Sequence, residues 1–263
     1  MRRAELFWGP LLILLGVLFF LDQMGYLPGG ALSWFLPFLV MAAGAWILIG
    51  GLQARKMSFE TSEQFSVPLQ EAREASLVIH HGVGEIRLQA GANPGDFLTG
   101  VSGPGMDKKI RLNDGKLEVE IDAGPNFVPF IGPDSGLWEY RLNEDVPVSI
   151  KVEAGASRLD FDLSDLRVTH FSFEGGASSV NLKLPARVEN ALIDLEAGAA
   201  SIDVQVPDGV ALRFRNKSTG SLDVDEARFP RRETGLYQSA DYAAAQYHAE
   251  VNVDGGATSI RVH

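Results

Sequence analysis

Three copies of one phrase read VEAGASRLDFDL at 152–163, FEGGASSVNLKL at 173–184 and LEAGAASIDVQV at 195–206. In each copy apolar and polar residues alternate, a glycine interrupts the alternation, and a second alternation follows. Inward side chains spaced by two are typical of a β-strand with one buried face. A period of this length is typical of stacked units, because each unit buries its apolar face only against its neighbours. The phrase therefore predicts an all-β domain of stacked strands.

Looser copies of the phrase lie at 76–91, 216–225 and 253–263, and each again contains a central glycine. Successive pivots in the central part of the chain are separated by 21, 22 and 22 residues. We expect a single-stranded β-helix-like, or stacked-strand, solenoid whose rungs follow one another in chain order. Glycine at each pivot accepts unusual backbone angles and lets adjacent coils approach. The structural repeat glycines are Gly82, Gly155, Gly176, Gly198, Gly220 and Gly256.

Alternation assigns the side chains of the repeats to two faces. Leu159, Phe161 and Leu163, with their equivalents in the next two copies, are expected to point inward. The outward columns are expected to be solvated and to read Asp160, Asn181, Asp203, Asp223 and Asp162, Lys183, Gln205, Asp225. Calcium is disfavoured there because asparagine, lysine and glutamine interrupt the carboxylates.

The β domain is expected to span 76–263 and to follow a linker at 58–75. Proline and glycine make 92–137 an irregular insertion, which contains a hairpin around Asn113-Asp114-Gly115. A second break in the period, the excursion 226–248, is interpreted as a packed cap for the solenoid end, with a partner-binding loop as the alternative.

Residues 1–57 differ in composition from the rest and predict a membrane hairpin with spans at about 6–21 and 31–52. A cleaved signal peptide is disfavoured because no small-x-small cleavage site follows the first span. Arg2 and Arg3 precede the first span, and Arg55 and Lys56 follow the second, whereas the loop between the spans has no basic residue. The positive-inside rule then predicts a multi-pass protein of the bacterial inner membrane, with both termini and the β domain in the cytoplasm.

Charge and composition exclude several classes of function. The chain carries a formal net charge of −11 and has no cysteine. This acidity argues against a nucleic-acid partner, and the absence of cysteine excludes disulfides and thiolate chemistry. His80 and His81 are adjacent, but successive strand side chains point to opposite faces, so the two cannot readily share one ion. No catalytic, cofactor-binding or metal-binding residue is therefore predicted.

One apolar stretch lies between Gly-Pro pairs and is a candidate contact patch, or else a loop folded over the edge of the core. We group it with two tyrosines of the 226–248 excursion. The candidate contact residues are Phe127, Val128, Phe130, Ile131, Tyr237 and Tyr242.

Several segments resemble a known family. FWGPLLILLGVLFFLDQMG at 7–25 and WFLPFLVMAAGAWILI at 34–49 resemble the membrane region of LiaF-type cell-envelope stress proteins. The segments 138–142, 147–185 and 228–262 are similar to the C-terminal "toastrack" β domain of those proteins, also labelled "putative adhesin". The resemblance implies a non-enzymatic regulator that restrains a membrane histidine kinase by protein–protein contact. It carries over no catalytic residue. The alternative is a structural scaffold or adhesin that self-assembles through its solenoid into homo-oligomers.

Overall fold

The computed structural model describes residues 20, 23–24, 63–102, 106–122 and 137–263. The chain separates into two compact units, 1–56 and 57–263, and the description that follows concerns the second. Within the described ranges, no helix has the length and apolar character needed to cross a membrane. The predicted spans at about 6–21 and 31–52 lie outside the described residues, apart from Phe20.

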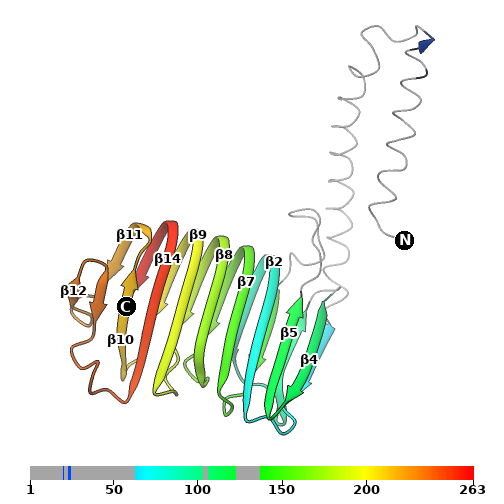
Figure 1. Cartoon of the computed structure of the whole chain (residues 1–263), viewed down its shortest axis with the longest axis horizontal. Coiled ribbons are helices and arrows are strands. Elements are labelled where there is room, and N and C mark those ends of the chain that lie inside the picture. The colour runs from blue at the N-terminus through cyan, green and yellow to red at the C-terminus, as the bar shows by residue number, and fades with distance from the viewer. Residues whose placement is uncertain (1–19, 21–22, 25–62, 103–105, 123–136) are drawn as a thin grey trace. The chain divides into compact units, whose positions relative to one another are not determined.

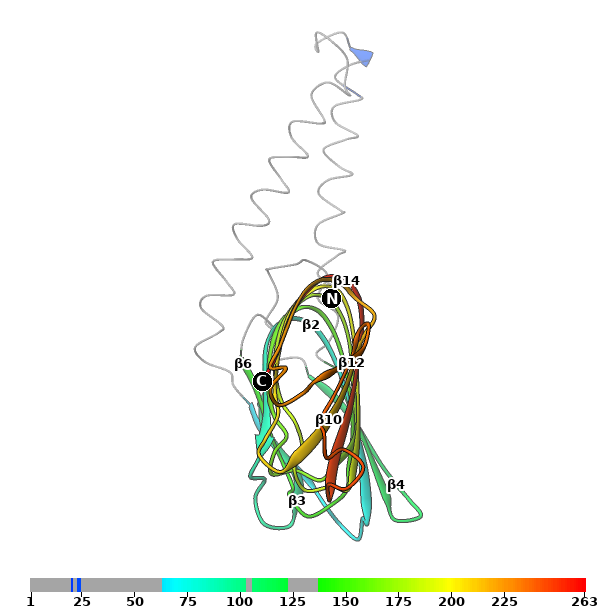
Figure 2. The same ribbon diagram turned by 90° about the vertical axis from the view of Figure 1, so that its left-hand side faces the viewer.

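Five long strands form the centre of the β domain and pair in parallel in the order β2-β7-β8-β9-β14 (Figure 1). Each strand bends near its glycine, so that Figure 2 shows the strands end-on as a row of arches. We call the half before the bend the first arm and the half after it the second arm. The strands are β2 (Glu74–Ala90), β7 (Val148–Asp162), β8 (Val168–Lys183), β9 (Asn190–Gln205) and β14 (Tyr247–Val262).

The core lies between the two arms and is formed by the inward columns expected from the alternation. Leu159, Phe161 and Leu163 are buried, and so are the residues at the equivalent positions of the next two rungs. Aromatic rings join neighbouring rungs: the Phe161 and Phe171 ring centroids are 5.3 Å apart in an edge-on arrangement. The all-β, stacked-strand fold predicted from the repeats is therefore present.

Both ends of the stack are closed by rungs that are split into two strands. At one end β5 (Lys116–Asp122) pairs with the first arm of β2, and β6 (Leu137–Leu142) pairs with the second arm. At the other end β10 (Val210–Asn216) and β11 (Thr219–Val224) pair in the same way with the two arms of β14. The expected insertion at 92–137 thus contributes β5, one half of the outermost rung.

The predicted chain order of the rungs is wrong at the C-terminal end. β14 lies between β9 and the β10–β11 rung, although it follows both in sequence. Val251, Ile260 and Val262 of β14 are buried, whereas Leu222 and Val224 of β11 are only half-buried. The second arm of β14, which has neighbours on both sides, is thus buried more deeply than the edge strand β11.

The stacked glycines are explained by the close approach of neighbouring backbones. A Cβ added at Gly155 would lie 2.7 Å from the Gly82 carbonyl oxygen, and one at Gly176 would lie 2.9 Å from the Gly155 oxygen. The series continues with 3.3 Å at Gly198 and 2.6 Å at Gly256, each to the glycine before it in the stack. Gly220 is not in this column, because it pairs with Thr258 and has a φ of 137°.

Antiparallel strands extend the sheet at the β5–β6 end. β4 (Asp107–Asn113) pairs with β5, and the turn between them has positive φ at Asp114 and Gly115, as expected for the predicted hairpin. On the second arm β3 (Asp96–Ser102) pairs with β6, and β1 (Glu63–Pro68) pairs with β3. The segment 58–75, expected as a linker, therefore contains an edge strand. Its Val67 is buried, and its terminal Pro68 is tolerated at a sheet edge.

The excursion at 226–248 covers part of the opposite end. β13 (Leu236–Gln238) pairs with the outer side of β10, and β12 (Arg231–Glu233) pairs with β13. Phe229 is 2% exposed, and Arg228 donates a hydrogen bond to the Val206 carbonyl at 3.0 Å. Through these contacts the excursion, interpreted above as a cap, packs on the outer side of β10. The cap extends only the first-arm sheet, so the outer edge of β11 has no strand partner within the part of the chain that the structure describes.

Candidate contact surface

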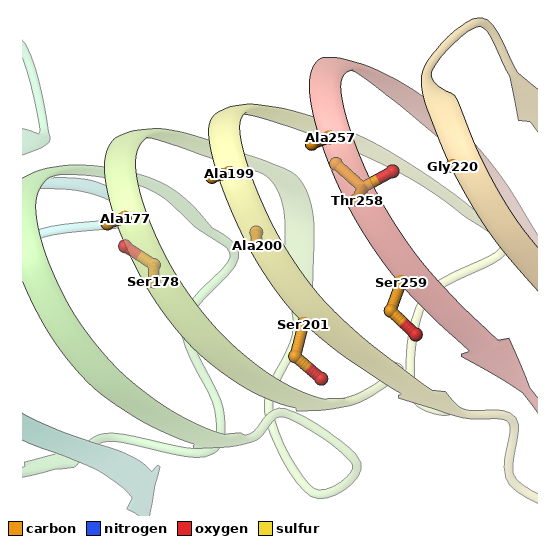
Figure 3. A pocket seen from close by; sticks show the side chains of 9 residues that line it. All are labelled: Ala177, Ser178, Ala199, Ala200, Ser201, Gly220, Ala257, Thr258 and Ser259. Atoms are coloured by element: carbon orange, nitrogen blue, oxygen red, sulfur yellow. The ribbon is translucent and has the colours of Figure 1, made fainter.

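An open groove of about 630 Å³ lies just after the bends and is crossed by β8, β9, β14 and β11 (Figure 3). Every lining side chain is small. The lining residues are Ala177, Ser178, Ala199, Ala200, Ser201, Gly220, Ala257, Thr258 and Ser259. We call this surface the small-residue groove.

The groove follows directly from the repeated phrase, in which each pivot glycine precedes two or three small residues. Parallel pairing in register places Ala177, Ala199 and Ala257 side by side as one exposed row. Small side chains in successive rungs leave a depression, because longer side chains would fill the space above the strands. A partner can therefore bring its own backbone or side chains close to this sheet.

The lining of the groove contains no titratable side chain. Its hydroxyl groups mainly connect β14 to β11: Thr258 Oγ1 donates to Ser218 Oγ at 2.7 Å, and Ser221 Oγ donates to Ser259 Oγ at 3.0 Å. Thr219 Oγ1 also donates to the Gly256 carbonyl at 2.7 Å. These bonds link β11 and the residue before it to β14. The groove can present shape and a few hydroxyls, but it offers no acid or base of its own for catalysis.

The outer face of the first arm carries an acidic row that the sequence reasoning missed. Glu153, Glu174, Glu196 and Asp254 lie in adjacent strands at paired positions. Lys151 bridges the first two, with Nζ 2.8 Å from Glu153 and 3.0 Å from Glu174, and these hydrogen bonds raise the pKa of Lys151 to about 12. The signal was available, because an acidic residue precedes the glycine at the same place in each copy of the phrase.

On the second arm, the predicted column that joins Asp203 to Asp223 is interrupted. Because β14 inserts between the two strands, Arg261 lies between these carboxylates, with Nη1 3.5 Å from Asp203 and Nε 3.9 Å from Asp223. The arginine relieves the repulsion that two neighbouring aspartates would exert. The column is solvated as expected, but its charges alternate.

The predicted contact residues are not brought together. Phe127, Val128, Phe130 and Ile131 lie outside the described residues. Tyr237 is only 8% exposed and packs with its ring centroid 6.4 Å from that of Phe214, so it belongs to the core. Tyr242 is half-buried, and the Arg213 guanidinium lies 4.3 Å from its ring centroid. Neither tyrosine lines the small-residue groove.

The two adjacent histidines separate as the alternation predicts. His81 is 5% exposed, and its ring centroid lies 5.3 Å from that of the buried Trp138. Burial lowers the pKa of His81 to about 4. His80 lies on the outer face of the first arm, where it contacts Glu153. The pair cannot act as a joint metal ligand.

The fold is a β domain of arched parallel strands stacked around one apolar core. Its open groove of small side chains suits contact with another molecule. The chain belongs to the family described as the N-terminal domain of toast_rack, DUF2154, whose model matches residues 55–205. No curated protein matches the chain.

One solved structure agrees with this fold. The chain is similar to the crystal structure of a "putative cell adhesion protein" from Clostridium sporogenes, with a TM-score of 0.69 and 20% identity over 77% of this chain and 99% of that one. A "putative adhesin" from Bacteroides fragilis also matches, at 12% identity over 77% of this chain and 96% of that one. Its TM-score of 0.27 is too low to support an argument.

Proposed function

We propose that the protein is a non-enzymatic, membrane-anchored regulator of bacterial cell-envelope stress signalling that acts by protein–protein contact on a membrane histidine kinase. The observation that carries this proposal is the small-residue groove beside the β11 edge, because an open surface of small side chains with no titratable lining suits contact with a protein better than catalysis. The family match and the uncharged segments at 6–21 and 31–52 support a toastrack domain attached to a membrane.

The groove and the β11 edge together suit a protein partner. A partner strand could pair with the outer edge of β11, which pairs with no other strand in the described ranges, because edge strands present free backbone donors and acceptors. The exposed alanines of the groove would let side chains of that partner approach the sheet. In this proposal the groove provides shape selection and the edge provides backbone hydrogen bonds.

The groove is tested by placing a long charged side chain in it. Ala199 is exposed in the middle of the alanine row, so Ala199→Arg should fill the groove without disturbing the core. Leu192 is a matched control, since it is 39% exposed on the same strand but on the other arm. We expect Ala199→Arg to abolish co-purification with the kinase and to alter stress-gene output under cell-wall antibiotics, whereas Leu192→Arg leaves both unchanged. Equal behaviour of the two variants would contradict the role of the groove.

The membrane attachment and orientation are tested separately. We propose an inner-membrane protein with both termini and the β domain in the cytoplasm, on the basis of the basic residues that flank the two apolar segments. Reporter fusions after Lys56 and at His263 should be active in the cytoplasm. Periplasmic activity at His263 would instead favour an adhesin or envelope-binding role.

A self-assembling scaffold or adhesin is the second candidate, and the β11 edge is the observation that favours it. Along Thr219–Val224 there is no lysine, arginine or proline. If two copies pair through this edge, sedimentation of the purified full chain should show a dimer that Ser221→Lys dissociates. A monomer at all concentrations would eliminate this candidate.

A further inference from the structure

His80 lies beside two carboxylates on the outer face of the first arm. Pairing of β2 with β5 places it opposite Asp122, and Glu120 is two residues away on the same face of β5. The Nε2 atom of His80 is 3.9 Å from Glu120 Oε1. One ligand atom from each of these three side chains lies within 4.8 Å of the other two.

The imidazole is held in the orientation that a metal ligand needs. His80 Nδ1 lies 3.0 Å from Glu153 Oε2 on the opposite neighbouring strand, β7. An ionised carboxylate can only accept a hydrogen bond, so in the neutral ring Nδ1 carries the proton and the lone pair of Nε2 faces Glu120. A carboxylate that fixes a histidine through its other ring nitrogen is the usual second shell of a metal site.

A cation already occupies the space between the two carboxylates. Lys109 on β4 places Nζ 3.0 Å from Glu120 Oε1 and 3.3 Å from Asp122 Oδ2. Hydrogen bonds to Glu120 and then Asp122 raise the pKa of Lys109. The lysine side chain is about half exposed, so its ammonium can exchange into solvent, where water and salt screen such pairs.

We propose that His80, Glu120 and Asp122 form a binding site for a divalent transition-metal cation such as Zn²⁺, which displaces the Lys109 ammonium. One imidazole nitrogen and two carboxylate oxygens are a donor set that Zn²⁺ accepts, with water at the fourth position. Ligands on one tetrahedral zinc ion lie roughly 3.4 Å apart, which rotation of three partly exposed side chains can reach. The imidazole selects against Mg²⁺ and Ca²⁺, because these cations prefer oxygen ligands.

A matched control exists on the same face of the sheet. His170 on β8 has Nε2 3.1 Å from Asp194 Oδ2, and its exposure is similar to that of His80. The other oxygen of Asp194 accepts a hydrogen bond from Asn252 at 2.9 Å, so that site has a histidine and one carboxylate in place of three ligands. His170→Ala therefore removes an exposed histidine without removing the proposed site.

The test is calorimetric titration of ZnCl₂ into the purified full chain with no affinity tag, and MgCl₂ is titrated in parallel. We expect saturable zinc binding that His80→Ala and Asp122→Asn abolish, and that His170→Ala leaves unchanged. Lys109→Met should tighten binding by roughly tenfold, because the competing cation is gone, and Glu153→Gln should weaken it by roughly tenfold.

The proposal is overturned if the chain takes up no zinc, if His80→Ala binds zinc as tightly as the native chain, or if magnesium binds equally well. Unchanged affinity in Lys109→Met would overturn the displacement of the lysine. Circular dichroism of each variant should match that of the native chain, since all the substituted side chains are partly exposed. None of these outcomes depends on the groove or on a kinase.

Discussion

Single residues control how closely neighbouring rungs approach, and the pivot glycines control it most directly. Their sequence positions predicted a special role, and the structure shows that the reason at Gly155, Gly176, Gly198 and Gly256 is the neighbouring carbonyl oxygen. Sequence alone could not separate this reason from backbone strain, because glycine satisfies both.

Alanine substitutions at the pivots should form a graded series. Gly155→Ala places a Cβ 2.7 Å from a backbone oxygen, whereas Gly198→Ala places it 3.3 Å away. We expect Gly155→Ala to lower the free energy of unfolding by about 1–3 kcal/mol, as overpacking does, and Gly198→Ala to cost distinctly less. Urea denaturation of the two variants measures the difference. Equal losses would show that the carbonyl contact is not the cause.

His81 should make the stability of the domain sensitive to acid. Its pKa is lowered from 6.5 to about 4 in the folded state, so between these values the unfolded chain binds a proton that the folded chain does not. The effect of His81 on the free energy of unfolding is therefore absent above about pH 6.5 and grows as the pH drops toward 4. At its largest, it lowers the free energy of unfolding by about 3 kcal/mol.

The His81 effect is isolated by comparing the native chain with His81→Phe. Phenylalanine keeps an aromatic ring beside Trp138 and removes the two buried ring nitrogens, and with them the titratable group. Urea titration at several pH values measures the free energy of unfolding of both proteins. We expect the stability advantage of His81→Phe over the native chain to increase as the pH falls from 6.5 to 4. A constant difference over this range would contradict the prediction.

Elements differ in how well their free edges are protected. β4 is exposed along its whole length and carries Lys108, Lys109 and Arg111, which disfavour pairing with another strand. β12 also carries two arginines, so both outer edge strands of the first-arm sheet carry basic residues. β11 has no such protection. The sequence predicted the hairpin around Asn113-Asp114-Gly115, but it could not identify which strands are edges, because an edge is defined by missing neighbours.

Removing the charges of β4 should therefore create an association site. We expect the triple variant Lys108→Thr, Lys109→Thr and Arg111→Thr to form larger assemblies than the native chain does at the same concentration, because the exposed β4 edge is then free to pair. Analytical ultracentrifugation at matched concentrations detects the change. Replacing Lys108 and Lys109 with arginine, with Arg111 left in place, keeps the charge and should leave the sedimentation profile native.

At the scale of the whole β domain, the sequence predicted the repeated unit and the inward columns, but not the position of β14 between β9 and the β10–β11 rung. Each phrase contains the same alternation, so nothing local specifies whether the copy at 253–263 pairs with the copy before it or with an earlier one. Ile202 pairs with Ile260, although the whole 206–246 region separates their strands in sequence. Such non-local pairing depends on the burial of the complete set of strands.

Truncation distinguishes the observed order from the sequential one. If rungs followed chain order, ending the chain at Asp225 would remove only the last rung. In the observed fold it removes β14, and β10 and β11 lose the strand on which they pair. We therefore expect limited proteolysis of the truncated protein to digest 206–225 while 63–205 resists. Full protection of 206–225 would contradict the inserted position of β14.

Both split rungs come from chain segments that diverge from the repeated phrase, whereas β7, β8 and β9 contact only strands of their own kind. Tandem duplication or loss of a unit of 21 or 22 residues between Asp162 and Val206 can then lengthen or shorten the stack without altering either terminus. Each such event moves the two ends apart or together by one strand spacing, roughly 4.8 Å. The length of the stack can therefore change during evolution in equal steps of one rung.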